Sequence, residues 1–113
     1  MSGRKNFAPA FKVVSDGDMS GQVIGTESTI NWLDNAGYQV KWDGDPVGEF
    51  YVDATINDED WEALDFGSAI VAAGVPGSFL INMNQLPYLK IRLRYEATSG
   101  DGALNAWVAA KMV

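Results

Sequence analysis

The clearest pattern in the chain is a two-residue alternation of apolar and polar side chains in its last quarter. Apolar residues at every second position from Leu89 to Tyr95 alternate with cations, and a second alternating run spans 103–111 after a turn rich in Thr, Ser, Gly and Asp. A period of two is typical of half-buried strands, so the pattern predicts a long antiparallel hairpin with Leu93 and Tyr95 in the core. The buried face of the second run is predicted to consist of Leu104, Ala106, Val108, Ala110 and Met112.

The same kind of unit occurs earlier in the chain. Apolar residues alternate with polar ones from Tyr38 to Trp42 and again from Phe50 to Ile56, around a turn that contains Gly, Asp and Pro. This pattern predicts a second long hairpin. A first strand is predicted at Phe7–Val14, with Phe7, Phe11 and Val13 on one face. It is predicted at a sheet edge, because Pro9 cannot donate to a central ladder.

These runs indicate an all-β protein. Short strands separated by turn signals, with no long helical period, predict an antiparallel β-sandwich or jelly roll of about seven to eight strands with little or no helix. A chain of 113 residues suits one domain with a single core. Residues 1–6 are predicted to be a flexible arm, and residues 7–113 a single sandwich domain.

The amino-acid composition excludes several classes of function. The chain has no Cys and no His, which removes the commonest nucleophiles, general bases and zinc ligands. We therefore expect no enzyme, and no catalytic, cofactor-binding or metal-binding residue. A net charge of −7 argues against nucleic-acid binding, and the chain shows neither a secretory signal nor an apolar run long enough to cross a membrane.

Three acidic clusters leave two interpretations open. Asp16–Asp18, Asp43–Asp45 and Asp58–Asp60 have carboxylates that calcium favours, but lack the spacing of an EF-hand loop. Asp and Gly also favour tight turns, and we prefer that interpretation. Paired acids of a glycosidase are a further possibility, although no pair stands out among 15 acidic residues.

The tryptophans suggest either a core or a binding platform for sugars. Trp42 and Trp61 lie on or beside apolar faces, which predicts core packing. Trp107 alternates out of phase with Ala106 and Val108. Either its strand is therefore buried on both sides or Trp107 faces a partner.

The cations of the last quarter also allow two interpretations. Lys90, Arg92 and Arg94 share one strand face, where cross-strand pairing with Asp53 or Glu49 is the favoured interpretation. The alternative is a stripe that docks an acidic protein partner. The candidate partner-binding residues are Lys90, Arg92, Arg94, Trp107, Arg4 and Lys5.

The amino-acid pattern of the two predicted hairpins resembles that of small virion proteins encoded by tailed bacteriophages and prophages. The resemblance covers about residues 37–113. The residues that carry it are Trp42, Gly44, Pro46, Val47, Gly48, Trp61, Leu64, Arg92, Tyr95, Thr98, Ser99, Gly100, Gly102, Leu104, Asn105 and Lys111. In size, acidity and expected fold the chain is also similar to the jelly-roll decoration (cement) proteins of phage heads.

The resemblance implies a virion structural protein, made in the host cytoplasm, that binds the outside of the head and stabilises it. Its implied partners are the major capsid protein or neighbouring virion proteins, with further copies of itself on the particle, and neither nucleic acid nor membrane. The alternative is a sandwich domain of a tail, adaptor or fibre with a carbohydrate-binding or receptor-binding role.

Overall fold

The computed structural model describes residues 7–30, 35–66, 69–84 and 88–111, and the predicted arm at 1–6 lies outside them. These residues form strands and connecting turns without a helix. The strands are β1 (Phe7–Asp18), β2 (Val23–Ile24), β3 (Ser28–Thr29), β4 (Asn35–Trp42), β5 (Val47–Thr55), β6 (Glu62–Ala63), β7 (Ile70–Ala73), β8 (Gly77–Met83), β9 (Lys90–Ser99) and β10 (Ala103–Lys111).

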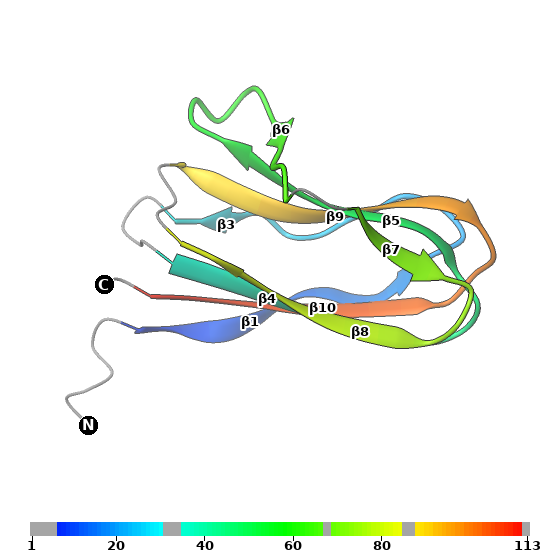
Figure 1. Cartoon of the computed structure of the whole chain (residues 1–113). Coiled ribbons are helices and arrows are strands. Elements are labelled where there is room, and N and C mark those ends of the chain that lie inside the picture. The colour runs from blue at the N-terminus through cyan, green and yellow to red at the C-terminus, as the bar shows by residue number, and fades with distance from the viewer. Residues whose placement is uncertain (1–6, 31–34, 67–68, 85–87, 112–113) are drawn as a thin grey trace.

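The strands form two antiparallel sheets stacked as two layers (Figure 1). Sheet A has the order β1-β10-β4-β8, and sheet B has the order β2-β9-β5-β6, with β3 also on β9 and β7 also on β5. If β2 with β3, and β6 with β7, each count as one interrupted strand, this is the strand order of a jelly roll. The predicted all-β sandwich is confirmed.

The two predicted hairpins are wrong in their pairing. β9 pairs with β5 in sheet B, whereas β10 pairs with β1 and β4 in sheet A. The same holds for β4 and β5, which lie in different sheets. Each turn is therefore an arch that carries the chain from one layer to the other, so the apolar faces of its two strands meet across the core. The two-residue alternation of a strand indicates which of its faces is buried. Because two strands joined by a hairpin and two strands joined by an arch show the same alternation, the sequence pattern does not distinguish the two connections.

The two arches lie side by side at one end of the sandwich. The amide of Asp45 donates to the carbonyl of Asp101 (2.9 Å), and the amide of Asp43 donates to that of Ala103 (3.2 Å). In return, the Asp43 carboxylate accepts from the amide of Ala103 (2.8 Å) and the Asp45 carboxylate from that of Asp101 (3.2 Å). The preferred turn interpretation of Asp43–Asp45 is confirmed, with the partner amides on the other arch.

In the first cluster the turn interpretation is confirmed for Asp18 alone, whose carboxylate accepts from the amide and the hydroxyl of Ser20. Asp16 and Gly17 lie within β1 instead, where Asp16 is hydrogen-bonded to Asn105 of β10. The third cluster lies in the loop after β5. Asp58 has a φ of 65°, and its amide is bound by the hydroxyl of Thr55. No group of three acidic, Cys or His side chains able to hold a metal ion occurs among the residues that the structure describes.

The core lies between the sheets and is built from the inward positions of all the long strands. Leu93, Tyr95 and Trp42 are buried, as predicted. Phe50 contacts both Trp42 and Tyr95, with ring centroids 5.0 and 4.8 Å apart. Such tilted ring pairs add to the stabilisation from buried area, so this aromatic cluster joins the two sheets.

Strand β1 lies at the edge of sheet A, as Pro9 predicted. Its pairing with β10 is interrupted by register shifts, so that Val13 and Val14 are both buried although they are neighbours. The predicted common face of Phe11 and Val13 is wrong, because Phe11 is 60% exposed. A bulge turns the side chains that follow it onto the opposite face.

The buried hydroxyl of Tyr38 makes the stability of the protein depend on pH. This hydroxyl has no hydrogen bond of normal geometry to the described residues. Burial raises the pKa of that hydroxyl, and the nearby Ser28 offsets only part of the rise. In the unfolded chain a tyrosine ionises near pH 10, so above that pH unfolding releases a proton and stability falls as pH rises.

Tyr38→Phe is therefore expected to change the free energy of unfolding by less than about 1 kcal/mol at neutral pH and to reduce the loss of stability at about pH 11. Urea unfolding at both pH values measures this. Some loss at high pH remains in the variant, because burial also raises the pKa of Tyr95. An unchanged pH dependence would contradict the prediction.

Candidate functional site

The outer face of sheet B is held together by a buried carboxylate. Asp53 on β5 points away from the core, yet it is only 3% exposed because Arg92 and Arg94 of β9 cover it. Arg92 donates through Nε to Asp53 (3.1 Å), and Arg94 donates through both Nε (2.9 Å) and Nη2 (3.1 Å). The bidentate Arg94 pair has the geometry of the stronger type of charged hydrogen bond.

Further contacts extend this network along β9. Arg94 also donates to Glu96 (2.8 Å) and stacks on Tyr51 at 4.3 Å from the ring centroid. Hydrogen bonds from Gln22 and then Arg94 lower the pKa of Glu96 below its ordinary value. The hydrogen bond to Asp53 raises the pKa of Arg94 well above its usual range, so the guanidinium stays charged.

Lys90 is paired as well. Its ammonium lies 2.9 Å from Asp58 and 3.5 Å from Glu27, and the hydrogen bond to Asp58 raises its pKa. The favoured interpretation of cross-strand pairing is confirmed for Arg92 and Arg94 with Asp53. Glu49 instead accepts a hydrogen bond from Tyr51. A docking role for Lys90, Arg92 and Arg94 stays a prediction. The charge of each of these cations is already balanced by a carboxylate of the same chain.

Trp61 lies on this outer face, and the prediction that it packs in the core is wrong. Its side chain is half-buried, and the Arg92 guanidinium lies 4.4 Å from its ring centroid. The segment between β5 and β6 rises above the outer layer in Figure 1. Trp61 belongs to this segment, because it directly precedes β6 in the chain. The tryptophan covers an arginine by a cation–π contact instead of filling the core.

Sheet A presents a different outer face. In the register of β1, β10, β4 and β8, one row of side chains crosses the whole sheet: Lys12, Trp107, Gln39 and Leu80. Trp107 is half-buried and the Lys12 ammonium lies 5.4 Å from its ring centroid. Trp107 points out of the sandwich while Ala106 and Val108 point in, and contact of Trp107 with a partner stays a prediction.

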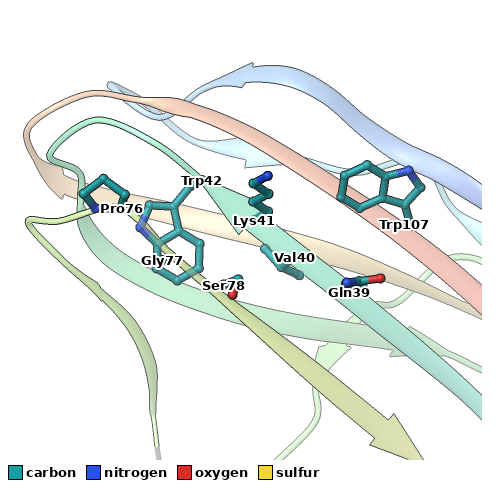
Figure 2. Close-up of a pocket in the computed structure, with 8 residues that line it drawn as sticks. All are labelled: Gln39, Val40, Lys41, Trp42, Pro76, Gly77, Ser78 and Trp107. Atoms are coloured by element: carbon teal, nitrogen blue, oxygen red, sulfur yellow. The ribbon is translucent and has the colours of Figure 1, made fainter.

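A groove of about 790 Å³ runs over this surface between Trp107 and the start of β8. Figure 2 shows Lys41 and Gln39 on β4 beside Trp107 on β10, with Pro76, Gly77 and Ser78 along the other side. Trp42 closes the far end, where its indole Nε1 donates to the carbonyl of Val75 (2.9 Å). We call the outward side chains around this groove the Trp107 face: Lys12, Gln39, Lys41, Ser78, Leu80, Asn105 and Trp107.

Charge is distributed differently over the two faces. Strands β4, β8 and β10 contain no Asp or Glu, whereas β1 contains Asp16 and Asp18, and the Asp16 carboxylate accepts a hydrogen bond from Asn105. Lys12 and Lys41 are exposed, and neither forms an ion pair within the part of the chain that the structure describes. Among the cations whose side chains the structure describes, Lys12 and Lys41 without an ion pair are therefore on sheet A, whereas Lys90, Arg92 and Arg94 with ion pairs are on sheet B. Of the other candidates, Arg4 and Lys5 lie outside the described residues.

Sequence reasoning selected Trp107 but missed the other members of the Trp107 face. The alternation of β4 already placed Gln39 and Lys41 on a polar face. The alternation does not indicate that β10 pairs with β4, and this pairing brings Gln39 and Lys41 beside Trp107.

Among the described residues, no helix is long and apolar enough to cross a membrane.

Comparison with known proteins finds likeness in fold alone. No family model matches the chain, and no curated protein is similar to it in sequence. The SPBc2 prophage-derived protein YomS is similar in structure, with a TM-score of 0.58 and 15% identity over 89% of this chain and 93% of that one.

Two further structures are similar. A chain of infectious bursal disease virus, strain Gx, has a TM-score of 0.58 and 10% identity over 92% of this chain, which spans only 32% of the viral one. A CBM4 carbohydrate-binding module has a TM-score of 0.51 and 12% identity over 96% of this chain and 73% of its own. At such identities these likenesses support the jelly-roll fold, which by itself does not determine a function.

Proposed function

We propose that this protein is a structural component of a tailed-phage particle, and specifically a decoration subunit on the outside of the head. The observation that carries the proposal is that its fold is similar, over 89% of the chain, to nearly the full length of a prophage-derived protein. The similarity in fold to a virus structure and the resemblance of residues 37–113 to phage virion proteins support it.

The Trp107 face is the surface best suited to contact the particle. It combines a half-buried tryptophan, an exposed leucine and two exposed lysines that form no ion pair with the described residues. Tryptophan is enriched among the few residues that carry most of the binding energy of a protein interface, and exposed cations guide an acidic partner into register. The Lys90, Arg92 and Arg94 stripe is a weaker candidate, because an incoming acid has to compete with Asp53, Asp58 and Glu96.

The proposal is tested on gradient-purified particles of the phage or prophage that encodes the chain. Quantitative peptide mass spectrometry is expected to find the protein on heads, in a copy number set by the head lattice. Heads that lack the protein are expected to rebind it when it is added back, and less of it as salt rises, because salt screens exposed charges. A few copies, found only on tails, would favour the tail or adaptor role, and absence from particles would contradict the proposal.

Trp107→Ala provides the sharper test of the surface. Because the indole lies on the outside of sheet A, the variant is expected to lose about 1 kcal/mol of stability or less, yet to bind heads about tenfold more weakly or worse. Trp61→Ala is the matched control, since it removes a half-buried tryptophan from the opposite face. Binding that is lost with Trp61→Ala and kept with Trp107→Ala would place the contact on sheet B.

The groove also supports a second candidate, a carbohydrate-binding role on a tail or fibre. Indole rings stack on sugar rings, and Gln39, Lys41 and Ser78 provide hydrogen-bonding groups beside Trp107. The similarity in fold to a CBM4 module is compatible with this role. A glycan array with the wild type and Trp107→Ala distinguishes the two: a signal that depends on Trp107, together with no binding to heads, would favour the carbohydrate role.

A further inference from the structure

The sheet edges of the protein differ in how well they are protected. An edge strand offers unpaired backbone N–H and C=O groups, and proteins usually blunt it with short strands, bulges, Pro or Lys. In sheet B both edges consist of short pieces, since β2, β3 and β6 have two residues each and β7 has four. At one edge of sheet A, β1 contains Pro9, Lys12 and several register shifts.

Strand β8 at the other edge of sheet A has none of these devices. It is seven residues long and contains neither a charged residue nor Pro. It pairs with β4 at every position from Gly77 to Met83 without a bulge, and no described strand pairs with its other side. Leu80, at its centre, is 65% exposed. Such a regular, apolar and uncharged edge is a site for pairing with another strand.

We propose that β8 pairs antiparallel with β8 of a second copy of this chain, which joins two sheets A into one continuous sheet. An antiparallel edge pair is related by a two-fold axis, so the strand is its own complement. With the axis at Leu80, this residue lies opposite its symmetry mate, and Ser78 lies opposite Asn82. The exposed leucine then becomes covered by an identical one.

Charge favours a second copy at this edge. Two chains of net charge −7 repel each other over most of their surfaces. At the β8 edge that repulsion is weakest, because β8 and its neighbour β4 carry no carboxylate. The inference is independent of the proposed virion role, since a dimer in solution requires no particle.

The test measures the mass of the purified full chain by sedimentation velocity over a concentration series. The expected result is a concentration-dependent shift from the monomer mass of 12.2 kDa to twice that value. Leu80→Lys places two like charges opposite each other at the axis and is expected to raise the dimer dissociation constant about tenfold or more. Ile56→Lys is the matched control, because Ile56 is 70% exposed but lies beyond the end of β5 in sheet B.

Hydrogen exchange of the wild type provides a test that does not depend on how well a variant folds. Backbone amides within Gly77–Met83 are expected to become more protected as concentration rises, while those of β1 at the opposite edge do not. A monomer at every concentration would overturn the proposal. So would a dimer that Leu80→Lys leaves intact, or growth beyond two copies, which a closed two-fold pair does not allow.

Discussion

Arg94→Met is expected to lower the free energy of unfolding by about 3 kcal/mol. The change removes the bidentate partner of Asp53, whose carboxylate is 3% exposed, and leaves that charge with a single hydrogen bond from Arg92. A buried charge that loses its partner costs more than the pair contributed, because water cannot replace the lost hydrogen bonds. Urea unfolding at neutral pH measures the difference.

A double-mutant cycle separates this charge effect from lost packing on Tyr51. In an Asp53→Asn background no buried charge remains, so Arg94→Met is expected to cost only about 1 kcal/mol. Lys41→Met removes an exposed cation from the other sheet and is expected to change stability by less than about 0.5 kcal/mol. Additive losses from Arg94→Met and Asp53→Asn would contradict the central role of this pair.

The second large effect is expected at the paired arches. Gly100 has a φ of 75°, and a Cβ at this position would overlap the carbonyl oxygen of Asp45 on the other arch. Gly100→Ala therefore combines backbone strain with a clash that has to push the arches apart, and we expect a loss of about 3 kcal/mol. Hydrogen exchange should show weaker protection at the amides of Asp101 and Ala103, which donate to the neighbouring arch.

Gly74→Ala is the matched control for this variant. Gly74 has a φ of 87°, but the nearest atom to an added Cβ is a side-chain carbon of Val47 at 3.7 Å. This variant experiences the backbone strain without the clash, and is expected to lose about 1 kcal/mol. Equal losses from the two glycine variants would show that the contact between the arches contributes little.

Much of the secondary structure was predictable because it depends on short-range periodicity. Alternation identified β4, β5, β9 and β10, and assigned Leu93, Tyr95, Leu104 and Val108 to the core. The edge position of β1 followed from Pro9. Errors arose where local rules compete: a bulge in β1 left Phe11 exposed, and a loop beyond β5 carried Trp61 to the surface.

The candidate sites were less predictable, because each needs strands that are distant in sequence. The cations of β9 were visible as a stripe, and cross-strand pairing with Asp53 was a favoured interpretation. The groove beside Trp107 was not foreseen, since its other residues come from β4 and from the start of β8. The unprotected edge at β8 likewise depends on the strand order of the whole sheet.

The sequence by itself determined the all-β class, the buried faces of β4, β5, β9 and β10, and the glycine- and aspartate-rich turns. Only the tertiary structure decided that those turns are arches between two sheets, that Asp53 is buried beneath two arginines, and that Lys12 and Lys41 form no ion pair with the described residues. The physical reason is that side-chain alternation follows from the local geometry of an extended chain. Which strands then pair depends on the packing of one shared core, to which residues from the whole chain contribute.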